Sequence, residues 1–218
     1  MKYETVIFDL DGTLLDTLDD LADATNRTME HFGFPKRSRE EIRSFVGNGI
    51  AKLVERAIPG GTDNPKYEEA LAWQKEYYND HCLEKTVPYP GIMDLLKKLY
   101  EQGYKLGIVS NKPQPSVERL TQIFFRDYIS ISVGDKKGVA RKPAPDSVLE
   151  AVRQLGSTLE KSIYVGDSEV DIQTADNAGI ACIAVSWGFR DYEQLRQAQA
   201  VHICKNSQQL LDMINGRI

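Results

Sequence analysis

Cysteine and histidine are scarce in this chain, with three of each among 218 residues. Cys82, Cys182 and Cys204 lie far apart and match no zinc-binding or redox spacing. The histidines are equally scattered, and we assign none of them a role. Few, widely separated cysteines are typical of a reducing compartment, so we expect a cytoplasmic protein without a thiolate or imidazole site.

Long apolar runs and basic blocks are missing as well. No apolar run is long enough to span a bilayer, and residues 1–4 lead into a strand pattern without the features of a signal peptide. The net charge is −5, and Lys and Arg form no block, which argues against nucleic acid as a partner. We therefore expect neither a membrane nor a nucleic acid to bind this protein.

What the sequence does contain is an alternation of apolar runs and helical periodicity from residue 91 onwards. A hydrophobic fraction of 41% over 218 residues fits one large domain, or one domain with an insertion. Short apolar strands separated by helices predict an α/β fold with a doubly wound, mostly parallel sheet, covered by helices on both faces. Strands are expected at residues 4–9, 106–109, 128–133, 162–165, 180–185 and 201–204.

Residues 15–86 differ in character, because they show helical spacing at four places and no strand pattern. We interpret them as an inserted helical domain, with residues 1–14 and 87–218 forming the core domain. Ligands of open parallel sheets bind at the carboxyl ends of the strands. Since the insertion leaves the core just after the first strand, we expect it to act as a cap over that edge.

The first predicted strand leads directly into two carboxylates, Asp9 and Asp11. In an extended chain, side chains two residues apart point the same way, so the two are expected to share one space. Two like charges that close are unfavourable unless a cation or a shared proton offsets them. The pair therefore indicates a metal, an acid–base partner for a nucleophile, or both.

Three further polar segments follow at predicted strand ends or in the loops beside them. They are Ser110-Asn111-Lys112, residues 141–145 around Lys142, and residues 166–171 with Asp167 and Asp171. In this order, together with residues 9–13, they resemble the haloacid dehalogenase-like superfamily of phosphotransferases. The resemblance covers the full length and includes an α-helical cap inserted after the first motif.

The resemblance implies roles for five residues. Asp9 would be the nucleophile that forms an aspartyl-phosphate, and Asp11 would protonate the leaving oxygen and later activate water. Lys142 would neutralise phosphate charge and orient the nucleophile. Mg²⁺ would bind the carboxylates of Asp9 and Asp167 and the backbone carbonyl of Asp11, with Asp171 supporting the ion directly or through water.

The same resemblance implies a phosphate-binding set. The side chain of Ser110 and the backbone N–H of Asn111 match phosphate-binding positions. Gly12 and Thr13 match a turn whose N–H groups meet phosphate oxygens, as backbone donors near helix starts often do. The expected partner is a small phosphorylated metabolite, and the expected assembly is a monomer or a homodimer.

The acid at Asp11 favours phosphate ester chemistry, since relatives that cleave carbon–halogen or phosphonate bonds usually lack it. Residues 43–50 in the predicted cap are similar to the substrate loop of phosphoglycolate phosphatases. This likeness implies substrate contacts from Arg43, Gly47, Asn48 and Gly49, and it makes 2-phosphoglycolate the favoured substrate. Arg43 and the glycine backbone are the expected readers of its carboxylate.

Other activities share the same core residues and stay open at this point. A β-phosphoglucomutase-like phosphosugar mutase carries a related glycine-containing cap loop. A pyrophosphatase or nucleotide phosphatase would use the same core with a different cap. A phosphoacceptor switch is less favoured, because receiver domains lack the helical insertion, and a binding module without catalysis is not supported, because all the matched residues are present.

Overall fold

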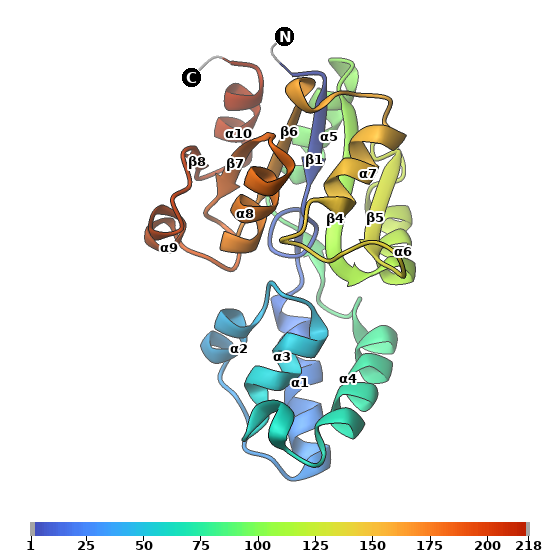
Figure 1. Cartoon of the computed structure of the whole chain (residues 1–218), viewed down its shortest axis with the longest axis vertical. Helices are drawn as coiled ribbons and strands as arrows, with labels where there is room; N and C mark the ends of the chain where they lie inside the picture. Colours follow the sequence, from blue (N-terminus) through green and yellow to red (C-terminus); the bar gives the residue numbers. More distant parts are fainter. Residues whose placement is uncertain (1–2, 217–218) are drawn as a thin grey trace. The chain divides into compact units, whose positions relative to one another are not determined.

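The computed structural model of the protein describes residues 3–216. The chain divides into two compact units (Figure 1). The core unit runs from the start of the described chain to Leu15 and from Pro88 to its end, and the helical unit is Asp16–Val87. Within the described residues, no helix combines the length and the apolar character needed to cross a membrane.

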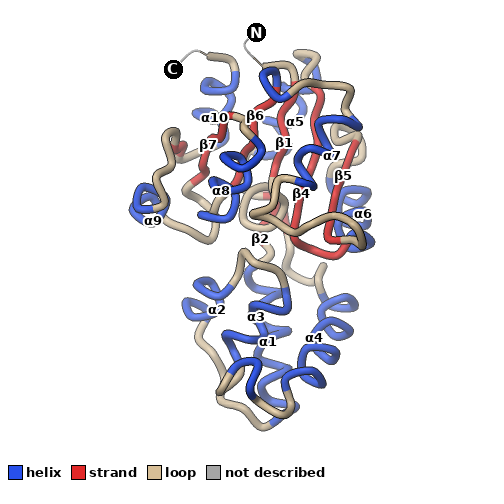
Figure 2. The backbone as a smooth tube through the Cα atoms, viewed as in Figure 1, coloured by secondary structure: helices blue, strands red, loops and turns tan. Residues whose placement is uncertain are grey.

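The core unit is built on a six-stranded parallel sheet (Figure 2). Its strand order is β5-β4-β1-β6-β7-β8, so β1 lies between two strands that come much later in the sequence. All four residues of β1 are buried, because helices cover both faces of the sheet. The strands are β1 (Thr5–Phe8), β4 (Lys105–Pro113), β5 (Ile131–Asp135), β6 (Ser162–Gly166), β7 (Ala181–Val185) and β8 (Ile203–Cys204).

One face of the sheet is covered by α7 (Asp146–Gln154) and α8 (Glu169–Ala178), which pack against each other. Ile7, Val109 and Tyr164, from three neighbouring strands, join these helices in one buried apolar cluster. Because side chains alternate along a strand, the residues beside them in sequence face the other side of the sheet.

The opposite face carries α5 (Ile92–Glu101) and α10 (Ser207–Ile214), which also contact each other (Figure 1). Each presents leucines at helical spacing to the core, among them Leu96 and Leu210. The unit is completed by α6 (Gln114–Phe124), α9 (Tyr192–Gln197) and the one-turn helix η2 (Leu159–Lys161).

The predicted α/β fold with a parallel sheet is confirmed. Several elements of the core unit differ from the prediction; β5, for example, begins at Ile131 and not at residue 128. β4 continues to Pro113, because its polar last residues leave no apolar signal, and its register with β5 shifts between Val109 and Pro113. The short helix α9 was not predicted, since Leu195 is its only buried residue and one residue makes no periodic pattern.

The helical unit packs its helices around one apolar cluster. Met29, Val54 and Ala70 come from three different helices and are fully buried there. Helical spacing in the sequence predicted all four helices of this unit. They are α1 (Leu18–Phe32), α2 (Arg39–Phe45), α3 (Ile50–Ala57) and α4 (Tyr67–His81), with the one-turn helix η1 (Gly61–Asp63) before α4. Its action as a cap stays a prediction.

The chain passes between the two units twice, and the two passages pair with each other. β2 (Leu15–Asp16) and β3 (Val87–Pro88) form a two-stranded sheet, which is too short to leave an alternating pattern in the sequence. Within the helical unit, the buried carboxylate of Asp20 accepts hydrogen bonds from the backbone N–H groups of Lys85 and Thr86, both at 2.9 Å. Asp20 thereby ties the returning chain to the first turn of α1.

Candidate active site

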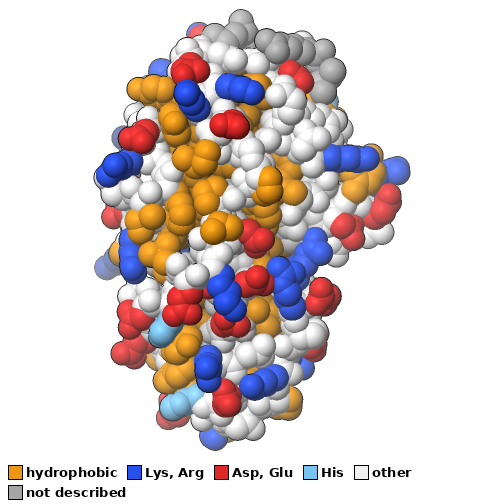
Figure 3. All heavy atoms as spheres, turned by 180° about the vertical axis from the view of Figure 1, so that it is seen from behind, with side chains coloured by type: hydrophobic (Ala, Val, Ile, Leu, Met, Phe, Trp, Pro, Cys, Tyr) orange, Lys and Arg blue, Asp and Glu red, His pale blue; other side chains and the backbone are white. Residues whose placement is uncertain are grey.

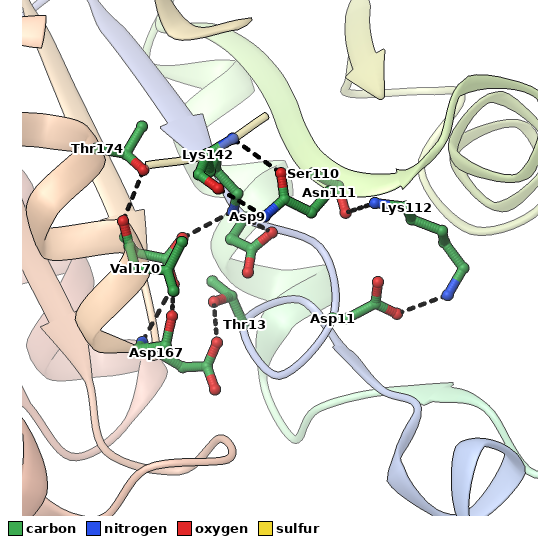
Figure 4. A network of polar contacts seen from close by, with 12 residues as sticks. Asp9, Asp11, Thr13, Ser110, Asn111, Lys112, Lys142, Asp167, Val170 and Thr174 are labelled. Carbon is green, nitrogen blue, oxygen red and sulfur yellow. Dashed lines mark hydrogen bonds and ion pairs between the residues drawn. The ribbon is translucent and has the colours of Figure 1, made fainter. Parts of the chain in front are cut away.

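The predicted catalytic residues of the core gather at the carboxyl ends of β1, β4 and β6 (Figure 4). Asp9 follows β1 and continues its pairing, with its N–H donating to the carbonyl of Val165 at 2.8 Å. Asp167 follows the neighbouring strand β6, and Asn111 lies in the irregular end of β4. Parallel neighbours end at the same edge, so three distant parts of the sequence meet there.

Lys142 is the buried cation of this edge. Its ammonium lies 2.9 Å from a carboxylate oxygen of Asp9 and 2.8 Å from one of Asp171, and it donates to the Tyr164 hydroxyl at 3.0 Å. The side-chain amide of Asn111 bonds twice to the backbone of Lys142. Its oxygen accepts from the N–H of Lys142 at 2.9 Å, and its nitrogen donates to the carbonyl of Lys142 at 3.1 Å. The loop that carries Lys142 is therefore held against β4.

Three carboxylates lie together at this edge, and two of them, Asp9 and Asp171, contact the ammonium. Asp9, Asp167 and Asp171 each place an oxygen within 4.8 Å of the other two. Burial raises the pKa of Asp9 to about 7, with Lys142 acting in the opposite direction. Burial also raises the pKa of Asp167 well above its ordinary value, and the charges of Asp171 and Asp9 add to the effect. Ionising all of these carboxylates therefore calls for positive charge beyond that of Lys142.

This donor set fits a divalent cation. Hard cations such as Mg²⁺ take carboxylate oxygens as ligands, and a second positive charge would offset what Lys142 leaves unbalanced. Asp171 is the most constrained of the three. Its one oxygen bonds to Lys142 and the Tyr164 hydroxyl, and the other accepts from the N–H and the hydroxyl of Ser168 at 3.1 and 2.6 Å. Asp9 and Asp167 are therefore the better candidates for direct ligands.

Asp11 does not share the space of Asp9, so the expectation that the two carboxylates crowd together is wrong for their side chains. The extended backbone of β1 ends at Phe8, and the chain turns at Gly12, whose φ is 88°. Asp11 instead forms an ion pair with Lys112 at 2.9 Å, on the side of the site away from Asp167 (Figure 4). A separate carboxylate suits a proton donor better than a metal ligand.

The remaining core residues expected to bind phosphate lie around the same edge. Thr13 donates its hydroxyl to Asp167 at 3.3 Å, and Gly12 runs so close to Asp167 that a side chain there would overlap its carboxylate. The Ser110 hydroxyl accepts from the backbone N–H of Lys112 at 3.1 Å. All three residues are buried.

The loop after β7, whose residues 187–190 also fit the phosphoglycolate phosphatase group by resemblance, contributes contacts that the sequence did not predict. The backbone N–H of Phe189 donates to Asp167 at 2.6 Å, and the indole N–H of Trp187 donates to the Thr13 carbonyl at 3.0 Å. Arg190 pairs with Glu169 at 2.8 Å. The position of this loop in the sequence could have indicated these contacts, because a segment that directly follows a parallel strand lies at the edge where the other strands end.

Gly188 lets the loop after β7 pass close to Gly12 and Asp167. We therefore expect Gly188→Ala to lower kcat/KM by at least about 100-fold, because a shift of reacting groups by about 1 Å has a cost of this size. An added Cβ would lie 2.2 Å from the Gly12 carbonyl and 2.5 Å from Asp167. Phosphate-release kinetics check the result. Gly179→Ala is the control for the added methyl group, which meets nothing within 4 Å there; its φ of 69° disfavours alanine, so this variant should lose stability but keep its kcat/KM. Unchanged turnover in Gly188→Ala would contradict the close approach.

The four predicted cap residues belong to the helical unit. Arg43 lies in the last turn of α2, and Gly47, Asn48 and Gly49 connect α2 to α3. Both glycines have positive φ, 112° and 82°, in the range that favours glycine over other residues. This connection therefore needs its glycines for backbone shape, and substrate contact by these residues stays a prediction.

Comparisons with known proteins agree with the arrangement of the core. The chain is 37% identical over 191 residues to a phosphoglycolate phosphatase of Pseudomonas putida, covering 84% of this chain and 70% of that protein. A phosphoglycolate phosphatase of Chromobacterium violaceum is 37% identical over 197 residues, covering 88% and 89%. A crystal structure of a candidate phosphoglycolate phosphatase from Lactobacillus delbrueckii subsp. bulgaricus is 39% identical with a TM-score of 0.95, covering 98% and 99%.

A family model, described as haloacid dehalogenase-like hydrolase, matches residues 6–185. The match includes β1 with Asp9, the helical unit, Lys142, and the end of β6 with Asp167. Since it spans most of the sequence and contains each motif of the site, the chain belongs to the haloacid dehalogenase-like hydrolase family.

Proposed function

We propose that this enzyme, a hydrolase of phosphoric monoesters, acts on 2-phosphoglycolate with Mg²⁺ and through a phosphorylated Asp9. The observation that carries the proposal is the contact of Asp9 with Lys142 at 2.9 Å, beside a three-carboxylate cluster. A carboxylate next to one fixed ammonium and a candidate cation site is placed to attack a phosphoryl group whose charge both would offset.

The proposed reaction has two displacements. An Asp9 oxygen attacks phosphorus, the bond from phosphorus to the ester oxygen breaks, and Asp11 gives that oxygen its proton. Water then attacks the phosphorus of the aspartyl-phosphate, Asp11 takes the proton of the water, and phosphate leaves as Asp9 is regenerated. Lys142 holds the nucleophile in position through both steps.

Other groups of the edge would bind the transferring phosphoryl oxygens. The Ser110 hydroxyl and the backbone N–H groups of Gly12, Thr13 and Asn111 are the proposed donors. When bound, Mg²⁺ would supply charge neutralisation at the phosphoryl oxygens, held by Asp9, Asp167 and the carbonyl of Asp11, with Asp171 behind them.

The substrate assignment is supported by the relatives named phosphoglycolate phosphatase. Arg43 and the backbone of residues 47–49 are part of the proposal as cap contacts to the substrate. We further propose that the protein works in the cytoplasm as a monomer or homodimer, without nucleic acid or membrane partners. A band of hydrophobic side chains over one face of the core unit (Figure 3) supports keeping the homodimer in this proposal.

Phosphate release from a panel of esters tests the proposed function. The panel contains 2-phosphoglycolate, pyrophosphate, mononucleotides and hexose phosphates, each with Mg²⁺ and with a chelator. We expect kcat/KM for 2-phosphoglycolate to exceed that of every other compound by at least about tenfold, and chelation to stop turnover. Faster release from another ester would reassign the substrate, and release from none would favour a phosphosugar mutase.

A further inference from the structure

We propose that Lys112 is the core residue that binds the carboxylate of the leaving group and so selects an acidic substrate. This inference rests on the proposed function, because it assigns the part of the site that recognises the glycolate half of the substrate. Lys112 is thus a specificity-determining residue, distinct from Lys142 on the phosphoryl side.

The position of Lys112 is fixed by the core unit itself. Its ammonium lies 2.9 Å from an oxygen of Asp11, and the two side chains are only 5% and 19% exposed. Its backbone N–H donates to the Ser110 hydroxyl at 3.1 Å, which anchors the irregular end of β4. Both members of the pair lie in the same unit, so their distance does not depend on the helical unit.

The proposed chemistry places the leaving group next to this ammonium. A proton donor must come within about 2.6–3.2 Å of the ester oxygen that it protonates. The ammonium contacts one carboxyl oxygen of Asp11 at 2.9 Å, and the other oxygen would carry the proton. The ammonium is therefore within roughly 8 Å of the ester oxygen. In 2-phosphoglycolate the carboxylate carbon is separated from the ester oxygen by one methylene, so the carboxylate can reach from that oxygen toward the ammonium.

Charge explains why a lysine suits this place. A buried ammonium is costly unless anions surround it, and it is a compact point charge with three N–H donors. It can attract a second carboxylate while it keeps its contact with Asp11. A neutral leaving group would gain nothing from it, so the cation discriminates between acidic and neutral esters.

The other buried cations of the described chain have different partners. Among residues 3–216, the buried basic side chains are Lys112, Lys142 and Arg190. Lys142 lies between Asp9 and Asp171, and Arg190 pairs with Glu169. Lys112 contacts the proposed proton donor, and that donor marks the side from which the leaving group departs.

The test compares two esters of similar size, 2-phosphoglycolate and 2-hydroxyethyl phosphate, which lacks the carboxylate. We expect Lys112→Met to lower the ratio of their kcat/KM values by about 10–100-fold, the effect of one hydrogen bond to a charged group. Most of the loss should appear as a higher KM for 2-phosphoglycolate. Inhibition by glycolate should weaken in the same variant.

Two further variants keep the test decisive. Lys112→Arg retains the cation and should retain a preference for the acidic ester even if turnover falls. Lys161→Met removes an exposed lysine that pairs with Glu4 and should leave the ratio unchanged.

Two negative outcomes are distinguishable. An equal loss for both esters in Lys112→Met would mean that Lys112 only positions Asp11, and it would overturn the inference. A wild-type enzyme that does not prefer 2-phosphoglycolate over the neutral ester would instead refute the proposed substrate, and with it the role of Lys112.

Discussion

Asp9→Asn is expected to lower kcat by at least about 10⁴-fold, the scale seen when a covalent nucleophile is removed. An amide at this position keeps the size of the side chain but lacks the negative oxygen that attacks phosphorus. No other carboxylate is placed to replace it, because Asp167 and Asp171 follow a different strand and Asp11 faces Lys112. Phosphate release at saturating substrate measures the loss.

The same variant should fold at least as well as the wild type. Because burial raises the pKa of Asp9 to about 7, its ionised form is less favourable in the folded than in the unfolded chain. Between the ordinary carboxyl pKa near 4 and about 7, this group therefore makes the protein less stable as the pH rises. In a chelator at pH 8, Asp9→Asn removes that cost, so its melting temperature should equal or exceed that of the wild type.

A matched control is Asp176→Asn, which changes an exposed carboxylate of α8 in the same way. We expect wild-type turnover from it. Substantial activity in Asp9→Asn, above a few per cent of the wild type, would be incompatible with nucleophilic attack by Asp9.

Lys142→Met is expected to cost about 3–5 kcal/mol of the free energy of unfolding, because it leaves buried charges without their partner. For a chain of this size the change corresponds to a fall of about 10 °C in melting temperature. Burial acts to lower the pKa of Lys142, but the charges of Asp171 and Asp9 outweigh this effect and raise that pKa well above its ordinary value. Lys142 is therefore an ammonium at neutral pH. Turnover should be lost together with the stability.

Two comparisons separate the charge of Lys142 from its packing. Tyr164→Phe removes one hydrogen-bond partner of the ammonium and should cost only about 1 kcal/mol. Mg²⁺ should restore part of the lost stability of Lys142→Met, because a bound cation supplies the missing counter-charge. A melting temperature equal to that of the wild type, measured in a chelator, would show that the carboxylates do not depend on Lys142.

Much of this architecture could be predicted from the sequence. The sheet edge was predictable because apolar strands are followed by polar residues, and this pattern alone places Asp9, Ser110 and Asp167 at one edge. Lys142 was identified by resemblance, since nothing in a loop lysine reveals that it will be buried between two carboxylates.

The rest depends on backbone geometry that has no sequence signature. The separation of Asp11 from Asp9 follows from the end of β1 at Phe8. The alternating pattern of residues continues past Phe8, so the sequence does not show where the strand ends. The contacts of Gly188 and Phe189 require knowing how closely two loops approach. The pairing of Lys112 with Asp11 joins residues 101 positions apart, and many lysines could have filled that role.

The central place of β1 has a consequence for how the chain is made. β1 is synthesised first, but its sheet neighbours β4 and β6 begin only at Lys105 and Ser162. At about 5–20 residues per second, an apolar strand waits roughly 5–20 s on the ribosome before its first partner exists. The helical unit, a continuous stretch of sequence, is complete before then. The inserted unit can thus fold during translation while the domain that it interrupts is still unable to form, and the catalytic edge cannot assemble until β6 and the loop after β7 have been synthesised.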